Sequence, residues 1–137
     1  MRIRLLLLIA ALAVAQAHEG HGKKTAPASA KNLKSPLTSE QEKPELGRPL
    51  YEKTCLPCHG ADGQAKSTEA LTIKPGPTNI ADHRMDSMTD GEIYWVVTNG
   101  IGKTMPGFKT HLNDADRWRI VAYVRHLRKA QSRPEHH

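Results

Sequence analysis

Two cysteines and a histidine stand together in the stretch TCLPCHGADG, residues 54–63. Cys55 and Cys58 are the only cysteines in the chain, and His59 follows them directly. Thiols three positions apart could form a redox pair, supply half of a zinc site, or tether a haem. In a helical turn, residues i, i+3 and i+4 lie on one face, so these three side chains would project together. That geometry suits one porphyrin, with two thioether bonds to its vinyl groups and an imidazole under its iron.

The other two chemistries of the cysteine pair find less support along the chain. A thiol–disulfide oxidoreductase would place C-x-x-C at a helix start after a hydrophobic strand, whereas GRPLYEKT, before Cys55, is helical or loop-like. Structural zinc needs four ligands, and the sequence offers no second ligand pair. The other histidines of the domain stand alone: His83, His111 and His126. The thiol redox protein stays an alternative.

The first 17 residues have the architecture of a secretory signal peptide. MRIR gives a positive start, residues 5–15 are an apolar run of 11, and AQA at residues 15–17 is a small-residue cleavage site. A spanning helix needs about 20 apolar residues, which is longer than this run. We expect cleavage near Ala17, a mature protein that begins at His18, and a periplasmic location with peripheral membrane association at most.

Charge argues against nucleic acid as a partner. The chain carries 20 basic and 14 acidic residues, and loss of Arg2 and Arg4 with the signal leaves a net charge of +4. Residues 44–129 are nearly balanced, with 12 basic and 10 acidic side chains. No basic stripe with interleaved aromatic residues occurs. We expect a monomer that binds no nucleic acid.

Few aromatic residues are available to build a core. The mature chain has six Phe, Trp and Tyr residues, and a domain of about 85 residues has an unfavourable ratio of surface to volume. Small exported domains usually compensate with disulfides, a metal or a cofactor. A disulfide between cysteines three residues apart would constrain the unfolded chain little. A large buried apolar cofactor would supply the missing core.

The composition also predicts the limits of the folded domain. Residues 18–43 are polar, rich in Lys, Ala, Ser and Pro, and lack a periodic apolar face, which predicts a disordered leader. Within it, His18 and His21 could bind copper or zinc with the new amino terminus, or could belong to a solvated tail. Residues 131–137 are predicted to be a flexible tail, and the domain is expected to span residues 44–130.

Helical periodicity dominates the domain, and no segment shows convincing period-2 alternation. The sequence therefore predicts an all-α domain of three main helices and long loops. The first helix leads into Cys55, and its regular part is expected to begin only near residues 48–49 because Pro49 lacks a backbone donor. Residues 64–84 hold several Pro and Gly residues and cannot form a long helix.

Capping residues predict the starts of the other two helices. Thr89 with Glu92 three residues later is a capping-box pattern before an apolar helical face. Asn113 or Asp114 is expected to cap the last helix, over residues 115–129. Its apolar residues alternate with DR (residues 116–117), Arg119 and RHLRK (residues 125–129), which are expected on the solvent side.

A haem iron would need a sixth ligand. Met105 lies in GKTMPGF, a short loop between two helices in which Pro106 and Gly107 restrict the backbone. A thioether delivered by such a loop is well placed to close the iron from the side opposite the histidine. Met85 and Met88 precede the second main helix, where apolar packing is expected instead.

Five motifs occur in order between residues 45 and 129: CLPCHG, GPTNI, TDGEIYWVVTNGI, MPGF and DRWRIVAYVRHL. With them the chain resembles a class I (monohaem) cytochrome c of the bacterial periplasmic type. The resemblance implies the cytochrome c fold, all-α and wrapped around one covalently attached haem c. It also implies that Cys55 and Cys58 attach the haem, and that His59 and Met105 are its axial ligands.

The resemblance implies supporting roles for further residues. Pro77 is similar to the residue whose carbonyl accepts the Nδ1–H of the proximal histidine. Gly47 and Tyr51 would cross the last helix near Ile120 and Tyr123. Three aromatic residues are expected around the haem: Trp95, Phe108 and Trp118.

A His/Met pair fills both axial positions and leaves one-electron transfer as the chemistry. We therefore expect an electron carrier, not an enzyme, that shuttles between membrane or periplasmic redox proteins in a periplasmic or respiratory chain. Lys66, Lys103 and Lys109 could rim a docking patch, or could be ordinary surface lysines. The alternatives are a haem c sensor or small haem enzyme with a labile methionine, and the cytochrome subunit of a larger oxidoreductase.

Overall fold

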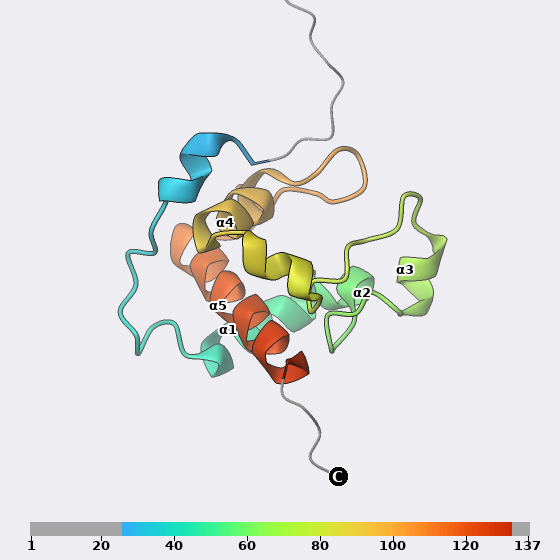
Figure 1. Cartoon of the computed structure of the whole chain (residues 1–137), viewed down its shortest axis with the longest axis horizontal. Helices are drawn as coiled ribbons and strands as arrows, with labels where there is room; N and C mark the ends of the chain where they lie inside the picture. The colour runs from blue at the N-terminus through green and yellow to red at the C-terminus, as the bar shows by residue number, and fades with distance from the viewer. Residues whose placement is uncertain (1–25, 133–137) are drawn as a thin grey trace, which may run out of the picture.

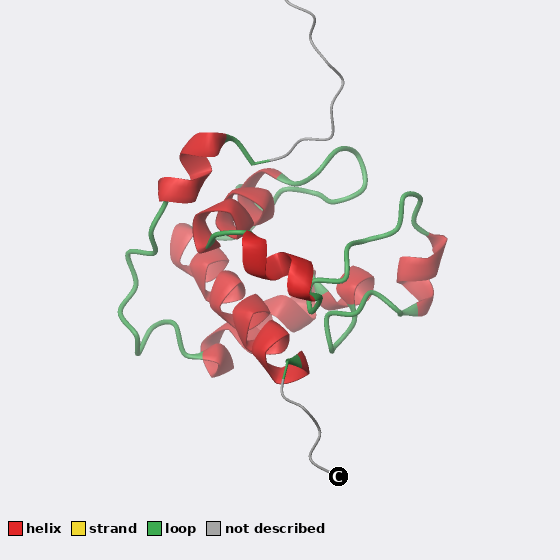
Figure 2. Ribbon diagram, in the orientation of Figure 1, coloured by secondary structure: helices red, strands yellow, loops and turns green. Residues whose placement is uncertain are grey.

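The computed structural model describes residues 26–132. This range is helical, without strands, and its helices are joined by long loops (Figure 1, Figure 2). Five α-helices occur in it: α1 (Pro44–Thr54), α2 (Leu56–His59), α3 (Thr68–Thr72), α4 (Asp90–Asn99) and α5 (Asp114–Gln131). Two 3-10 helices accompany them: η1 (Ala28–Asn32) and η2 (His83–Ser87). The predicted all-α class is confirmed.

Several predictions fall outside the described range. The signal peptide, His18, His21 and residues 133–137 of the predicted tail are among them. Among residues 26–132, no helix is both long and apolar enough to cross a membrane.

The crossing of α1 and α5 is the most extensive contact between two elements of the fold (Figure 1). It depends on Gly47, where a Cβ atom would collide with the backbone carbonyl of Arg119 and lie 2.9 Å from Cβ of Tyr123. One turn further, Tyr51 is 1% exposed, and its ring centroid lies 5.1 Å from that of Tyr123. The crossing of the first and last helices at Gly47 and Tyr51 is therefore present.

Helix α1 begins earlier than predicted. It starts at Pro44 and continues through Pro49, whereas the sequence predicted a regular start near residues 48–49. Pro49 removes one backbone donor from the helix. The chain stays helical because Gly47 and Tyr51, on either side of that proline, are both buried in the contact with α5. Packing outweighs the lost hydrogen bond.

The predicted capping box at α4 is present. The Thr89 side chain accepts a hydrogen bond from the Glu92 amide at 3.2 Å, and the Glu92 carboxylate accepts one from the Thr89 amide at 2.8 Å. That second bond holds the pKa of Glu92 below its ordinary value. With its first turn capped in this way, α4 buries Ile93 and Val97.

Residues 26–43 differ from the disordered leader that the sequence predicted. The η1 segment lies against α4, and Ala30 is 2% exposed. At Gly91 of α4, a Cβ atom would collide with the carbonyl of Ala30 and approach that of Leu33 to 2.8 Å. Because this contact joins two backbones, the segment can dock on α4 without the periodic apolar face whose absence predicted disorder. Leu37 adds a side chain packed against the core.

Helix α5 is slightly longer than the predicted residues 115–129, and it begins at Asp114 with Asn113 as its N-cap. The Asn113 side chain accepts a hydrogen bond from the Asp116 amide at 2.9 Å. The core is built around α5 from eleven buried residues: Tyr51, Cys55, Met85, Ile93, Val97, Trp118, Ile120, Val121, Tyr123, Val124 and Leu127.

The region between α2 and α4 contains only the short helices α3 and η2, as the prediction of no long helix required. Two arginines of α5 bind the end of this region. Arg125 donates to the Met85 carbonyl at 2.9 Å and pairs with Asp90 at 2.6 Å. Arg128 pairs with Asp86 at 2.7 Å.

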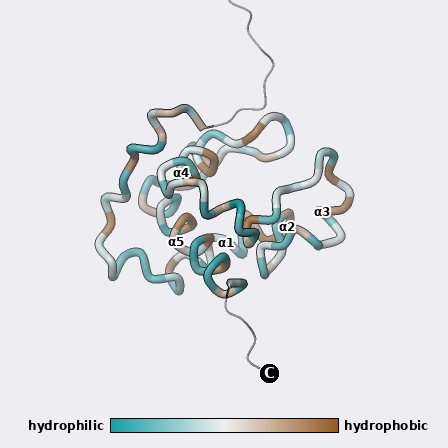
Figure 3. Tube along the Cα trace, viewed as in Figure 1, coloured by the Kyte–Doolittle hydropathy of each residue, from teal (hydrophilic) through white to brown (hydrophobic). Residues whose placement is uncertain are grey.

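Hydrophobic residues also occur along the α3 segment (Figure 3), where Leu71 is 68% exposed.

Replacing Gly47 with alanine should destabilise the protein, because the new methyl group forces the α1 and α5 backbones apart. We expect a loss of about 1–3 kcal/mol, measured as a lower thermal midpoint of the purified holoprotein. Gly76→Ala is the matched control, since its nearest new contact is the Ile73 carbonyl at 3.8 Å and its φ is not positive. Equal midpoints for the two variants would contradict the role assigned to the crossing.

Candidate functional site

The C-x-x-C-H segment forms one tight helical turn directly after α1. Cys55 ends α1 and caps α2, and its carbonyl accepts hydrogen bonds from the amides of Cys58 at 3.2 Å and His59 at 2.9 Å. Gly60, at φ +77°, ends the turn in a conformation that favours glycine. The backbone thus has the helical form from which the shared face of Cys55, Cys58 and His59 was predicted.

The two cysteines are free thiols in different surroundings. Cys55 is buried and Cys58 is half-buried. Burial raises the pKa of the Cys55 thiol, while a contact with the Thr54 hydroxyl at 3.3 Å acts in the opposite direction. The Thr54 hydroxyl also donates to the Leu50 carbonyl at 2.7 Å. At neutral pH Cys55 is therefore a thiol and not a thiolate.

His59 is held in one tautomer. Its Nδ1 atom lies 3.0 Å from the carbonyl oxygen of Thr78. Because a carbonyl can only accept, the proton must be on Nδ1. Burial lowers the pKa of His59 and this bond offsets part of the shift, so the neutral ring is favoured. In a neutral ring protonated at Nδ1, Nε2 keeps its lone pair free to bind a metal.

The acceptor for His59 corrects the assignment of Pro77. The sequence resemblance placed the accepting carbonyl at Pro77, but the carbonyl of the next residue, Thr78, makes the bond. The path of the loop decides this, since the Ile80 amide donates to the Gly63 carbonyl at 2.9 Å and so ties residues 78–80 to the turn after His59. The accepting carbonyl therefore lies in the GPTNI motif, as predicted, but one residue later than predicted.

Tyr51 stabilises the same turn from α1. Its hydroxyl donates to the Gly60 carbonyl at 2.7 Å. Burial raises its pKa far above the ordinary value, so the phenol keeps its proton. The buried face of α1 that crosses α5 therefore also fixes the residue that follows His59.

Met105 lies in a loop with a fixed backbone. The amides and carbonyls of Ile101 and Met105 form a reciprocal pair of hydrogen bonds, at 2.9 and 3.2 Å. A side chain at Gly100 would collide with the Met105 carbonyl, and one at Gly107 would lie 2.6 Å from the Thr98 carbonyl. Next along the chain, the Phe108 amide donates to Val97 of α4 at 2.9 Å. These contacts hold the methionine between the bridge to Ile101 and the bond from Phe108 to α4.

The three described methionines differ in how they are packed. Met85 is 8% exposed and belongs to the core, and Met88 packs against it. This agrees with the apolar packing expected of both. Met105 is half-buried and is not among the residues packed against the core. Of the three described methionines, Met105 is thus the one whose side chain does not pack against the core.

The aromatic residues predicted near a haem occupy different surroundings. Trp118 is 4% exposed and stacks on Tyr94, with ring centroids 4.1 Å apart. Phe108 is half-buried and packs against the core. Trp95 is half-buried without packing against it. Of the three, Trp118 is a core residue, whereas Trp95 keeps an exposed face.

Sequence reasoning missed one buried charged residue. Arg117 follows Asp116 in the DR pair that was expected on the solvent side of α5. The structure contradicts that prediction, since Arg117 is only 7% exposed. The spacing of Arg117 with Ile120, Val121 and Val124 at i+3, i+4 and i+7 was the available signal, since it places the arginine on the apolar face. That signal does not say which partners make the burial possible.

The predicted surface residues are exposed. Lys66, Lys103 and Lys109 are solvent-accessible. So are three histidines considered as metal ligands: His83, His111 and His126. Within the part of the chain that the structure describes, no three His, Cys, Asp or Glu side chains gather as a metal site would require.

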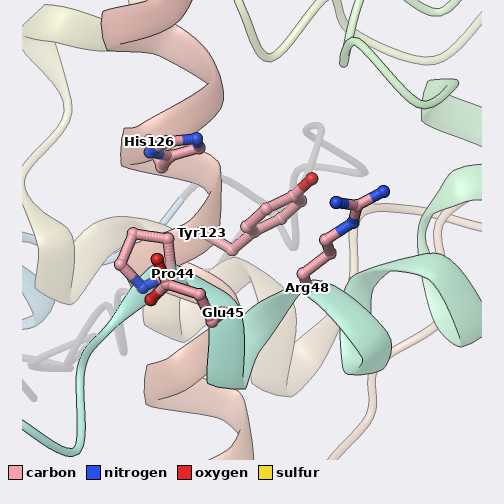
Figure 4. Close-up of a pocket in the computed structure, with 5 residues that line it drawn as sticks. All are labelled: Pro44, Glu45, Arg48, Tyr123 and His126. Atoms are coloured by element: carbon pink, nitrogen blue, oxygen red, sulfur yellow. The ribbon is translucent and has the colours of Figure 1, made fainter.

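A shallow depression lies where the start of α1 meets α5 (Figure 4). The residues lining it are Pro44, Glu45, Arg48, Tyr123 and His126. None of them belongs to the C-x-x-C-H turn or the Met105 loop. The depression lies on the outer side of the helix crossing. There the Tyr123 ring stacks on that of His126, with ring centroids 5.9 Å apart.

Comparisons with known proteins point to one class. Residues 42–124 match the family model described as cytochrome C oxidase, cbb3-type, subunit III. The solved KustC0563 c-type cytochrome is 28% identical, with a TM-score of 0.53, and the match covers 59% of this chain and 95% of that one. A chain of the Kuenenia stuttgartiensis reducing HAO-like protein complex Kustc0457/Kustc0458 is 25% identical, with a TM-score of 0.58. That match covers 71% of this chain and 48% of the other, so this chain spans about half its length.

The comparison with curated proteins found no match. The region matched by the family model contains every residue predicted to bind the cofactor.

The residues present fit a haem c. Two free thiols in one helical turn are the attachment groups that the cofactor needs, and a neutral imidazole protonated at Nδ1 is its usual proximal ligand. The Thr78 carbonyl supplies the outer hydrogen bond that orients such a ligand. Cys55, Cys58 and His59 would hold the group.

Tyr51→Phe should destabilise the turn after His59, because the Gly60 carbonyl loses a buried donor. We expect a loss of about 1 kcal/mol, measured by chemical denaturation of the holoprotein. Tyr123→Phe is the control: its ring packs on that of Tyr51, but its hydroxyl makes no hydrogen bond to any described residue. If both variants lose the same stability, the bond to Gly60 is not the cause.

Proposed function

Because the chain belongs to the c-type cytochrome family described as cytochrome C oxidase, cbb3-type, subunit III, we propose that it is a one-electron carrier with a single haem c. Membership in this family makes it a haem-binding electron-transfer protein. The proposal adds that Cys55 and Cys58 attach the haem. His59 and Met105 would be the two protein ligands of its iron.

The state of His59 is the observation that carries the proposal. A histidine next to two free thiols, buried, neutral and protonated at Nδ1, has one lone pair left for iron. The different packing of the methionines supports the second ligand. Met85 and Met88 take part in the core, whereas Met105 does not and sits on a loop of fixed backbone.

The residues of the chain would tune the electron transfer. Haem c, when bound, supplies a one-electron couple between ferric and ferrous iron. The thioether of Met105 would stabilise the reduced state of the bound haem and so raise its potential relative to two histidine ligands. With His59 and Met105 both bound to it, the iron would offer a substrate no open site. The fixed Thr78–His59 and Ile101–Met105 contacts keep the ligands in place in both redox states.

The amino terminus supports a proposal about where the protein acts. Residues 1–17 read as a signal peptide, and we propose that the mature protein begins at His18 and works in the periplasm. Its partners there would be membrane or periplasmic redox proteins. A second role is as the cytochrome subunit of a larger oxidoreductase. The similarity to a chain of a reducing HAO-like complex favours that alternative, and co-purification from native membranes would distinguish the two.

Met105→Ala is the direct test of the ligand pair. The wild-type holoprotein should show a low-spin c-type spectrum with a methionine-to-iron charge-transfer band. The variant should lose that band, and its midpoint potential should fall by on the order of 0.1 V, because axial ligands set haem potentials over a wide range.

Met88→Ala is the matched control, since Met88 is the other partly buried methionine of the described chain. It should keep the band and the potential. A Met105→Ala protein with an unchanged spectrum would move the ligand to Met85 or Met88. A wild-type protein with high-spin iron that binds carbon monoxide quickly would favour the sensor or small haem enzyme with a labile methionine.

A further inference from the structure

Arg117 is a charged residue inside the fold. It lies on the apolar face of α5 and is 7% exposed. Burying a guanidinium is costly unless it is paired and hydrogen-bonded. Its surroundings must therefore compensate, and the groups that do so lie next to the Met105 loop.

The guanidinium of Arg117 connects three parts of the chain. Its NH1 atom donates to the backbone carbonyls of Lys109 at 3.2 Å and Leu112 at 2.8 Å. Its NH2 atom donates to the Tyr94 hydroxyl and to the Asp114 carboxylate, both at 3.0 Å. Burial acts to lower its pKa, but the contacts with Tyr94 and Asp114 outweigh it and the pKa lies above its ordinary value. The side chain is charged, and it joins α4, α5 and the segment between them.

Tyr94 completes this cluster from α4. Its hydroxyl also donates to Asp114, and its ring stacks on Trp118 with centroids 4.1 Å apart. The Arg117 guanidinium carbon lies 5.5 Å from the centroid of the same ring. We call Tyr94, Asp114 and Arg117 the arginine cluster.

The arginine cluster closes the far end of the loop that carries Met105. At the near end, the Ile101–Met105 pair closes the loop on itself, two residues after the end of α4. At the far end, the amides of Phe108 and Lys109 donate to the carbonyls of Val97 and Thr98 at 2.9 and 3.2 Å. Those two backbone bonds are followed directly by the carbonyls that Arg117 binds. Loss of the guanidinium would leave residues 109–112 tied to the helices by fewer bonds.

We propose that Arg117 is a positioning residue for Met105, and that it sets how rarely the methionine leaves the iron. This rests on the proposed His/Met ligation. Arg117 does not touch the iron site in any contact of the described chain. It acts through the backbone of the loop, and Tyr94 holds the guanidinium in place.

The test measures displacement of Met105 by an added ligand. Cyanide binds the oxidised holoprotein only after the methionine has left, so its binding rate at saturating cyanide reports how often the loop opens. In Arg117→Met, which keeps the length and apolar stem, we expect about tenfold faster binding, because two carbonyls of the loop lose a charged donor. In Tyr94→Phe, which keeps the stacking on Trp118, we expect a smaller acceleration.

Arg128→Met is the matched control. Arg128 lies on the same helix and forms an ion pair with Asp86, but it makes no hydrogen bond to the Met105 loop. Its cyanide rate should equal that of wild type at a temperature where all variants are folded. Amide hydrogen exchange gives a second readout, and residues 108–112 should lose protection in Arg117→Met but not in Arg128→Met.

Different results would overturn different statements. A methionine-to-iron band in wild type with unchanged cyanide rates in Arg117→Met and Tyr94→Phe would overturn the positioning role only. So would an equal acceleration in Arg128→Met, since that would indicate a general loss of stability. A wild-type protein without the band would overturn the ligand pair and this inference together. If Arg117→Met does not form a holoprotein, the cyanide rate of Tyr94→Phe decides whether the positioning role holds.

Discussion

The contact between the α1 and α5 backbones is the constraint on which the rest of this structure depends. Gly47 lets α1 approach the Arg119 carbonyl more closely than any side chain would allow. Tyr51, one turn on, is packed by the same crossing and reaches the Gly60 carbonyl with its hydroxyl. The C-x-x-C-H turn begins where α1 ends, so the crossing fixes where the two thiols and the imidazole stand relative to the core. A small domain with few aromatic residues gains a precise site from one close helix contact.

Arginine and lysine have separate roles in the described chain. Each of its six arginines forms an ion pair, whereas of its nine lysines only Lys43 does. Exposed pairs contribute at most about 1 kcal/mol each, so their number matters less than what the guanidinium groups also bind. Arg117 and Arg125 donate to backbone carbonyls of loops as well as to carboxylates. The planar guanidinium can serve both kinds of acceptor at once, which a lysine ammonium does less well. Loops around the site are thereby held on α5.

The segment before α1 extends the domain beyond the family match. Residues 26–41 lie outside the matched region, yet η1 is docked on α4 through Gly91. Helix α4 is therefore covered by η1 on one side and packed against α5 on another, and its C-terminus supports the Met105 loop. A helix held on two sides in this way gives the Met105 loop a fixed support.

The sequence by itself determined whatever depends on local spacing. The C-x-x-C-H turn, the Thr89–Glu92 capping box and the all-α class could all be predicted, because hydrogen bonds within four residues decide them. Tertiary structure decided that Thr78 and not Pro77 accepts from His59, that α1 runs through Pro49, and that Arg117 is buried. Each of those outcomes depends on groups that distant segments deliver: a loop carbonyl 19 residues away, the surface of α5, and acceptors on α4 and its following loop. Periodicity can place a residue on a face, but only the assembled chain supplies the partners that meet it there.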